Sequence, residues 1–401
     1  MLHALFIMLL ADPSCSSDSR KVLGVKNMGQ EETPLFLRPR TLRPPAAQGG
    51  QFTRRLAMNK AGRMIAAAMQ DRTIRLFDAH SCEEIQKMAD AFLCTSLAFS
   101  PKGDVIASGG VDRIVKVWDI RTGTLLTKLE GHTYPVLTLA FSPDGSRLVS
   151  GSGDTTLIVW DLDKRSKIHQ LKGHSLYVVA CDWDPKGDRI ISGGVDSSIR
   201  VWDSATGKMT AKMDDHRTAV HAVRFSHDGF KLASGSSDQT VILWDAAGDS
   251  LSLNHVLQGH SGEVRSLAFN ADGKYLASGS SDKDLLVWST ERHVVEGRGT
   301  AMAEIDGIEW YPSENAFLTS DGSGAITQWT VADLASTMAP IQSLLKEIEA
   351  DTRQIHRKEL AQKFEELRSQ YDDEMLRDKR LFYVVWQCKK ALGLLKAPTK
   401  T

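Results

Sequence analysis

The chain has 401 residues, of which 42% are hydrophobic and 25% are charged, a composition that allows a large core and an appendage. Its 49 Lys and Arg residues nearly balance its 50 Asp and Glu residues, which excludes a general electrostatic attraction to nucleic acid or to an anionic membrane. Five cysteines without a Cys-x-x-Cys pair indicate reduced thiols. We therefore expect a cytoplasmic protein, with the nucleus as the alternative, and neither a metal nor another cofactor.

An apolar run, Met1–Ala11, opens the chain. No Lys or Arg precedes it, no small-x-small cleavage site follows, and it is too short to span a bilayer, so we expect neither a signal peptide nor a membrane anchor. Residues 1–33 are expected to be an extension outside the folded domain. The next stretch, LFLRPRTL at 35–42, predicts an edge strand, because proline is tolerated where a ladder needs no donor. The alternative is a basic arm for nucleic acid, carried by Arg38, Arg40 and Arg43.

A unit of just over forty residues then repeats along the chain. Its clearest copy, Gly131–Asp161, begins with Gly-His, ends with Trp-Asp, and holds three short alternating apolar runs separated by turn sequences such as Ser-Pro-Asp-Gly. The aromatic residue near the end of the unit recurs at intervals of 41 to 44 residues, at Phe77, Trp118, Trp160, Trp202, Trp244, Trp288 and Trp329.

Seven such units in register resemble the WD40-repeat family, and the resemblance covers residues 34–334. It implies an all-β fold, a seven-bladed β-propeller, in which each four-stranded blade buries its two apolar faces against its neighbours around a closed ring. In this family the sequence unit and the blade are offset by one strand. The resemblance therefore makes residues 35–42 the outer strand that completes the last blade.

Units three to six each contain a His, a Ser, and an Asp that lies six residues before the Trp. The resemblance implies a hydrogen-bonded chain within each blade, running from indole to hydroxyl to imidazole to carboxylate. A Ser-His-Asp set also suggests nucleophilic catalysis, but an active site is needed once and this set occurs four times, so we expect a structural role. The four tetrads are His132, Ser150, Asp154, Trp160; His174, Ser192, Asp196, Trp202; His216, Ser234, Asp238, Trp244; and His260, Ser278, Asp282, Trp288.

The remaining units depart from this set. Unit two has Asp90 in place of the His, unit one ends with Phe77 in place of a Trp, and unit seven has Ala301 and Ser323 where His and Asp are expected. Repeat arrays commonly deviate toward their ends, where the ring is closed.

Partner-binding candidates fall in two places. Loops after the His and residues before the Asp are expected on the narrower face of the propeller, where apolar side chains would form an interaction patch; these are Val111, Tyr134, Leu176, Tyr177 and Val195. Separately, Trp118-Asp119-Ile120-Arg121 is similar to the motif by which some WD40 proteins bind the adaptor of a cullin-RING ubiquitin ligase. That resemblance singles out Asp112, Asp119 and Arg121.

The repeat ends near residue 334. Residues 335–340 predict a linker, and residues 341–397 predict a long C-terminal α-helical, coiled-coil-like extension, because Ile341–Leu392 lacks Gly and Pro and carries apolar residues at heptad spacing. A helix with one apolar stripe needs a partner surface. The propeller, a second copy of the chain and another protein all remain open.

These observations predict a non-enzymatic scaffold or adaptor that binds other proteins through the propeller face and the C-terminal helix within a multiprotein complex. Two alternatives remain open. One is a substrate receptor of a cullin-RING ubiquitin ligase, and the other is a subunit of an RNA-processing or ribosome-assembly particle, supported by the arginines at 38–43 and by Arg54 and Arg55.

Overall fold

A computed structural model describes residues 35–42, 52–69, 71–90, 92–248, 251–333, 340, 343–348, 357–368, 385 and 388–389. The expected N-terminal extension, residues 1–33, lies outside these ranges. The chain divides into two compact units, one of residues 37–331 and one that joins the two chain ends. We describe each by itself.

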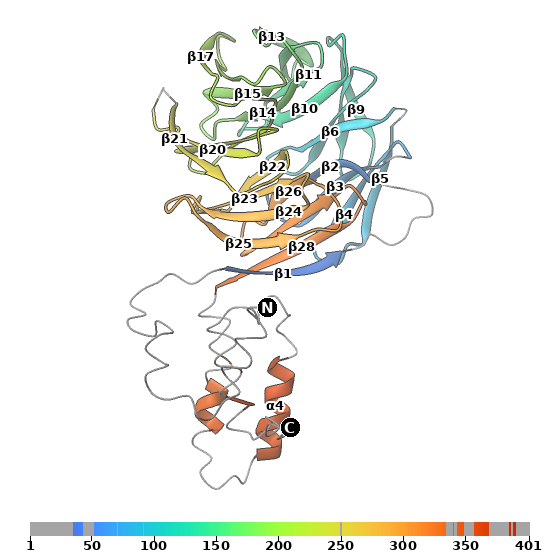
Figure 1. Ribbon diagram of the computed structural model, residues 1–401. Helices are drawn as coiled ribbons and strands as arrows, with labels where there is room; N and C mark the ends of the chain where they lie inside the picture. Colours follow the sequence, from blue (N-terminus) through green and yellow to red (C-terminus); the bar gives the residue numbers. More distant parts are fainter. Residues whose placement is uncertain are drawn as a thin grey trace. The chain divides into compact units, whose positions relative to one another are not determined.

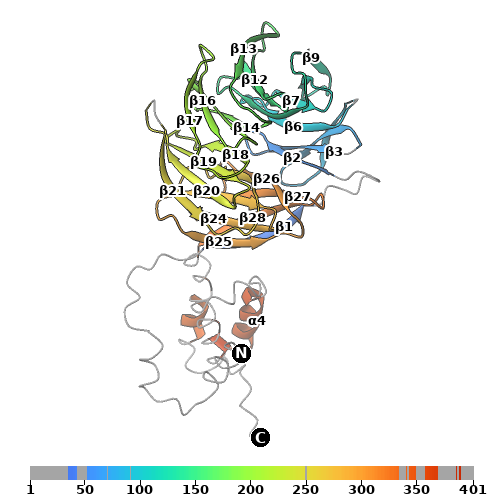
Figure 2. The same cartoon turned by 45° about the horizontal axis from the view of Figure 1, so that its top comes forward.

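The larger unit is a ring of seven four-stranded sheets, the blades (Figures 1 and 2). Strands within each of the first six blades follow chain order. Blade one is β2 (Phe52–Met58), β3 (Met64–Met69), β4 (Thr73–Asp78) and β5 (Glu84–Ala89); blade two is β6 (Cys94–Phe99), β7 (Val105–Gly110), β8 (Val115–Asp119) and β9 (Leu125–Leu129); blade three is β10 (Val136–Phe141), β11 (Arg147–Ser152), β12 (Thr156–Asp161) and β13 (Ser166–Lys172).

The other blades repeat this order. Blade four is β14 (Val178–Trp183), β15 (Arg189–Gly194), β16 (Ile199–Asp203) and β17 (Met209–Met213); blade five is β18 (Val220–Phe225), β19 (Lys231–Ser236), β20 (Thr240–Asp245) and β21 (Ser252–Gln258); blade six is β22 (Val264–Phe269), β23 (Tyr275–Ser280), β24 (Asp284–Ser289) and β25 (Val295–Thr300); blade seven is β26 (Ile305–Trp310), β27 (Ala316–Asp321), β28 (Ile326–Asp333) and β1 (Leu35–Leu42).

The ring closes as the resemblance implies. The first strand of each blade contacts the first strand of the next, and β26 contacts β2. Figures 1 and 2 both show the blue strands of blade one beside the orange strands of blade seven. Strand β1 completes blade seven by pairing with β28, so the two ends of the repeat share one sheet. The seven-bladed all-β propeller is thus confirmed.

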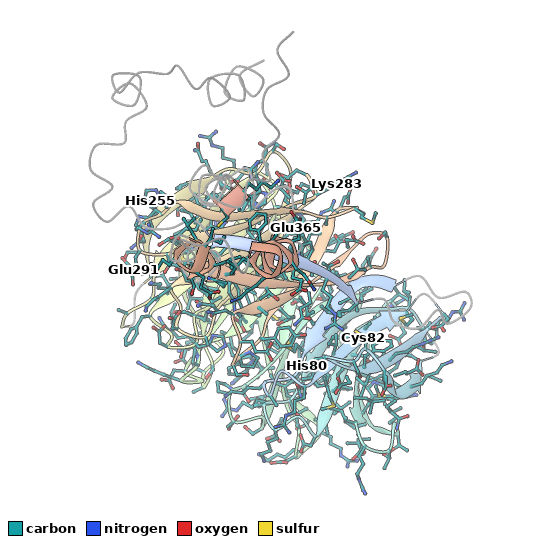
Figure 3. The ribbon with its side chains drawn as sticks, turned by 90° about the horizontal axis from the view of Figure 1, so that it is seen from below. His80, Cys82, His255, Lys283, Glu291 and Glu365 are labelled. Carbon is teal, nitrogen blue, oxygen red and sulfur yellow. The ribbon has the colours of Figure 1, made fainter. Side chains whose placement is uncertain are left out.

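The core lies between the blades. Clusters of buried side chains join one blade to the next; in one of them Ile158 and Trp160 of blade three pack with Val115 and Val117 of blade two. Cys94 and Cys181 are buried within strands, as small apolar side chains would be. In blade one, Cys82 is also buried and follows the exposed His80 in the turn after β4 (Figure 3).

The C-terminal part contains two short helical segments, residues 343–348 and α4 (Arg357–Arg368). Phe364 is fully buried, and Lys363 forms an ion pair of 2.7 Å with Glu347, which links the two segments. A single long coiled-coil-like helix is not confirmed. Most of the predicted heptad positions after Phe364 lie outside the described ranges.

Candidate functional site

Each tetrad draws its four side chains from different parts of one blade. In blade three, Trp160 on β12 donates its indole N–H to the Ser150 hydroxyl on β11, with 2.8 Å between Nε1 and Oγ. The His132 ring lies 2.8 Å from the same hydroxyl through Nε2 and 2.8 Å from Asp154 Oδ2 through Nδ1. Because an ionised carboxylate only accepts hydrogen bonds, Nδ1 donates to it and Nε2 accepts the serine proton.

Blades four, five and six repeat this geometry, with the three contacts between 2.7 and 3.1 Å. The hydrogen-bonded chain runs across the sheet from the third strand, through the second strand, to the loop that precedes the first. It therefore connects segments that the β-ladder alone does not join. We expect such a completely paired network to make the blade rigid.

The tetrad aspartate also organises the tight turn that contains it. In blade three the Asp154 carboxylate accepts the backbone N–H groups of Thr133, at 3.0 Å, and Thr156, at 2.9 Å. Burial disfavours the charge of Asp154, but hydrogen bonds from His132 and Thr156 outweigh burial and lower the pKa of the carboxyl. Thr155, the next residue, has a φ of 71°, in the left-handed region.

Solvent access decides whether a tetrad serine can act as a nucleophile. All four serines, Ser150, Ser192, Ser234 and Ser278, are 0% exposed. Each also receives the tryptophan N–H and touches the histidine ring, so no substrate carbonyl can approach the oxygen. The arrangement is a buried hydrogen-bonded network that links the strands of one blade.

Strand direction assigns every connection to one of two ends of the ring. The loops before the first strands and the turns between second and third strands share one end, here called the His-loop face, because neighbouring strands are antiparallel. The remaining turns lie on the opposite face.

The predicted apolar candidates do lie on the His-loop face. Tyr134, Leu176 and Tyr177 are about half exposed, Val111 is 41% exposed, and Val195 is half-buried. The rings of Tyr134 and Tyr177 lie 6.3 Å apart between centroids, which places side chains of blades three and four together.

Two further apolar residues, Phe92 and Leu93, are exposed in the same loop of blade two. They were missed because no Gly-His marks this unit, although their distance from Asp90 equals that of Tyr134 and Pro135 from His132. We call Phe92, Leu93, Val111, Tyr134, Leu176, Tyr177 and Val195 the apolar patch.

Asp119 and Arg121 lie on the opposite face, in the turn after β8, and are therefore not part of the patch. The Asp119 carboxylate accepts the backbone N–H of Thr122 at 2.7 Å, and this bond lowers the pKa of Asp119. The Arg121 carbonyl accepts a hydrogen bond from Gln86, and its side chain is exposed. The sequence-predicted partner residues thus form two groups on opposite faces.

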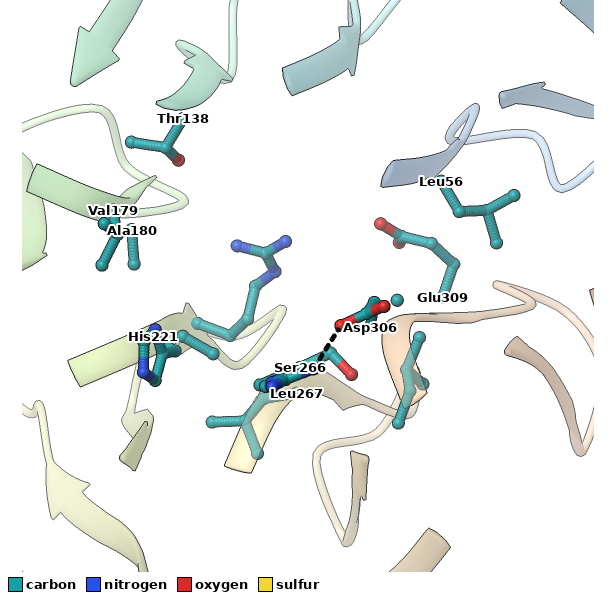
Figure 4. Close-up of a pocket in the computed structure, with 14 residues that line it drawn as sticks. Leu56, Thr138, Val179, Ala180, His221, Ser266, Leu267, Asp306 and Glu309 are labelled. Atoms are coloured by element: carbon teal, nitrogen blue, oxygen red, sulfur yellow. Dashed lines mark hydrogen bonds and ion pairs between the residues drawn. The ribbon is translucent and has the colours of Figure 1, made fainter. Parts of the chain in front are cut away.

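A pocket in the middle of the ring is lined by residues of the first strands, including Arg224, Arg265, Asp306 and Glu309 (Figure 4). Burial raises the pKa of Glu309 to about 7, against the neighbouring charge of Arg224. Among the described residues, no group of three or more His, Cys, Asp or Glu side chains could hold a metal ion. In the same residues, no helix is long and apolar enough to cross a membrane.

The family model for the WD domain, G-beta repeat, matches this chain five times, at residues 86–119, 123–161, 165–203, 207–245 and 251–289. The chain contains WD40 repeats. Each matched repeat begins near an outer strand and ends with the third strand of the next blade, so the repeat and the blade are offset by one strand.

Curated relatives share short stretches with the chain. Autophagy-related protein 16 of Arabidopsis thaliana is 33% identical over 19% of this chain and 15% of its own length. The U5 small nuclear ribonucleoprotein 40 kDa protein of Dictyostelium discoideum is 34% identical over 14% of this chain and 16% of its own. The probable serine/threonine-protein kinase PkwA of Thermomonospora curvata is 38% identical over 14% and 8%. The chain thus matches less than a fifth of each relative.

The WD40 signature weakens in blades one, two and seven, where other residues occupy some of the tetrad positions. In blade two, the buried ammonium of Lys116 lies between the carboxylates of Asp90 and Asp112 and takes the place of the imidazole. In blade one, Phe77 has no N–H to donate, and Ala67 stands where the serine would accept it. In blade seven, Trp329 donates to Thr319 at 2.9 Å.

Proposed function

We propose that this protein is a non-enzymatic scaffold that binds partner proteins through the apolar patch on the His-loop face of its propeller. WD40 propellers in general mediate protein–protein interactions, and the fold is typically that of a scaffold. The observation that supports the assignment to this face is the exposure of Phe92, Tyr134, Leu176 and Tyr177 in neighbouring blades. Aromatic side chains gathered on a rigid surface are the residues that contribute most to binding energy.

Affinity purification followed by mass spectrometry tests this proposal. We would compare the wild-type chain with Tyr134→Ser/Tyr177→Ser, and use Phe230→Ser as the matched control, because Phe230 is equally exposed but lies in a turn on the opposite face. The proposal expects specific partners to be lost with the double variant and retained with the control. Partners that are unaffected by the double variant would overturn it.

The role of the C-terminal part is a second component of the proposal. Ion pairing between Lys363 and Glu347 supports a folded C-terminal unit that could add a second attachment or self-association. A chain that ends at Ala339 should then lose a defined subset of partners, or its self-association by light scattering. An unchanged partner list and unchanged mass would remove this component.

Two alternative functions rest on the opposite face and on the N-terminal arginines. The exposed Arg121 beside Asp119 fits the receptor of a cullin-RING ligase, for which Arg121→Asp should abolish recovery of the adaptor. The likeness to a protein named for the U5 small nuclear ribonucleoprotein favours a ribonucleoprotein subunit. In that case RNA binding should weaken with salt and with loss of Arg38, Arg40 and Arg43.

A further inference from the structure

The inner rim of the His-loop face can be compared blade by blade because one backbone hydrogen bond recurs in it. In blades two to seven, the N–H of the residue before the tetrad aspartate position donates to a carbonyl just before the first strand, at 2.9 to 3.1 Å. The six carbonyl-bearing residues, in blade order, are Leu93, Pro135, Tyr177, Ala219, Glu263 and Glu304. They occupy equivalent places around the ring.

The rim changes character halfway around. Blades two to four present Leu93, Pro135 and Tyr177, beside the rest of the apolar patch. Blades six and seven present Glu263 and Glu304, whose side chains are 43% and 44% exposed. The donors follow the same division in four blades, because Val111 and Val195 serve blades two and four, whereas Ser237 and Ser281 serve blades five and six. Blades three and seven both use a glycine, Gly153 and Gly322.

On blades six and seven, the cluster of charges at the rim carries an excess of negative charge. Glu263, Glu304 and Asp306 all pair with one guanidinium, that of Arg265. Three carboxylates on one cation leave a formal excess of two negative charges. Lys283, a cation of the same blade that is labelled in Figure 3, lies in the turn between the second and third strands, β23 and β24, whereas Arg265 lies on the first strand, β22.

From this arrangement we infer that the His-loop face binds a peptide segment of a partner protein that combines aromatic or branched apolar side chains with Lys or Arg. The apolar side chains of the peptide contact blades two to four, and its Lys or Arg side chains contact the carboxylates of blades six and seven. The charge of the rim determines the class of partner, because the carboxylates attract a cationic peptide and repel the phosphates of a nucleic acid. This inference rests on the proposed function and gives its partner a chemical identity.

Selection of a random-peptide phage library on the full-length chain tests the inference. Enriched peptides are expected to contain apolar residues together with Lys or Arg. On Glu263→Lys/Glu304→Lys, selection should shift from cationic to acidic residues while the apolar residues remain. The matched control, Glu83→Lys/Glu291→Lys, reverses two exposed carboxylates in turns of the opposite face and should select the wild-type set; Glu291 is labelled in Figure 3.

Affinities of one enriched peptide separate this inference from the proposed function. We expect Tyr177→Ser to weaken binding at least about tenfold, and Glu263→Gln/Glu304→Gln to weaken binding about threefold to tenfold and to flatten its salt dependence. The glutamine pair retains hydrogen-bonding side chains if charge reversal should unfold the blade.

Binding that is lost with Tyr177→Ser but unchanged by the Lys and Gln substitutions at Glu263 and Glu304 would show that the partner peptide need not be cationic. The proposed binding face would then stand. Peptides that bind equally to all these variants would overturn both.

Discussion

Blades two and three connect equivalent segments with different chemistry. In blade three, the His132 ring lies between the Ser150 hydroxyl and the Asp154 carboxylate. In blade two, the Lys116 ammonium lies between two carboxylates, while Trp118 still donates to Ser108 at 2.9 Å.

The positions correspond through the ladder. Lys116 lies opposite Ser108 in blade two, and Ile158 lies opposite Ser150 in blade three. The lesson of this pair of blades is that the buried carboxylate of the turn is paired in both, by an imidazole in blade three and by an ammonium in blade two, so histidine is not required at this place. Losing one residue of the charged cluster in blade two is expected to cost more stability than losing one residue of a tetrad, because a buried charge that loses its partner remains desolvated.

The first prediction concerns the removal of the Lys116 ammonium from blade two. The side chains of Lys116, Asp90 and Asp112 are at most 6% exposed. Lys116→Ile, which introduces the blade-three residue, should lower the free energy of unfolding by about 3 to 5 kcal/mol, because two carboxylates lose their cation in a buried site. Urea denaturation followed by tryptophan fluorescence measures the change.

A rescue variant is the control for this prediction. Asp90→His/Lys116→Ile builds the blade-three residue set into blade two, since Ser108, Asp112 and Trp118 are already present. We expect the double variant to recover at least about 2 kcal/mol of the loss, because a single carboxylate is then left and the introduced imidazole can donate to it. If the double variant is no more stable than Lys116→Ile, the two arrangements are not interchangeable.

The second prediction removes the serine that Trp160 and His132 share in blade three. Ser150→Ala leaves the Trp160 N–H and the His132 ring without their common partner, and should cost about 2 to 4 kcal/mol. Blade one indicates the compensation, since Phe77 there accompanies Ala67. Trp160→Phe/Ser150→Ala should therefore cost about 1 kcal/mol less than the sum of the two single changes, by a double-mutant cycle. Additive costs would contradict a shared hydrogen bond.

Sequence alone predicted the repeating part of the molecule well, because the signals that define a blade are local and recur. Turn sequences, alternating apolar runs and the Trp position marked the seven repeats, and the family resemblance of these repeats implied the seven blades and the closing strand at residues 35–42. The partner of Asp112 in blade two was not predicted. In the sequence, Lys116 resembles an ordinary surface residue. Only the strand register shows that it lies opposite Ser108 and pairs with Asp90.

The functional surface was predictable in part for the same reason. Tyr134 and Tyr177 were found because they follow a Gly-His marker, whereas Phe92 and Leu93 follow an unmarked loop. The acidic rim depends on comparing Glu263 with Glu304 around the ring, and this equivalence became visible through a backbone hydrogen bond. The single long C-terminal helix was not confirmed, and heptad spacing shows which residues share a face but not whether the helix is continuous.

The third prediction contrasts the hydrogen-bonded tetrads with the central pocket. The pKa of Glu309 is raised by burial to about 7, so the folded state binds this proton more tightly than the unfolded state does. The resulting stability is fully present below the unfolded pKa, near 4.5, and is lost as pH rises to about 7. Glu309→Gln should be more stable than wild type by about 1 to 3 kcal/mol at pH 8, with the difference much reduced at pH 4.

Thermal unfolding of both proteins between pH 4 and pH 8 measures this effect. A control change, Glu291→Gln, removes an exposed carboxylate from a turn of blade six and should give a small difference with no such rise toward high pH. A gain for Glu309→Gln that is equal at both ends of the range would show that the carboxyl is not held protonated.

The last prediction concerns a turn conformation that the blades with a His tetrad share with blade two. The residue after the turn aspartate has positive φ in blades of both kinds, including Arg113 at 71° and Gln239 at 72°. Glycine adopts this conformation without steric cost, so Gln239→Gly should leave the free energy of unfolding unchanged or raise it by up to about 1 kcal/mol.

Gln258 is the matched control, because it is also exposed but lies at the end of strand β21. Gln258→Gly should destabilise by about 0.5 to 1 kcal/mol, since glycine loses more chain entropy in a strand. Equal losses at both positions would mean that the turn tolerates glutamine without strain. In that case the hydrogen bonds of Asp238 to the backbone of Arg217 and Thr240 would alone determine the shape of the turn.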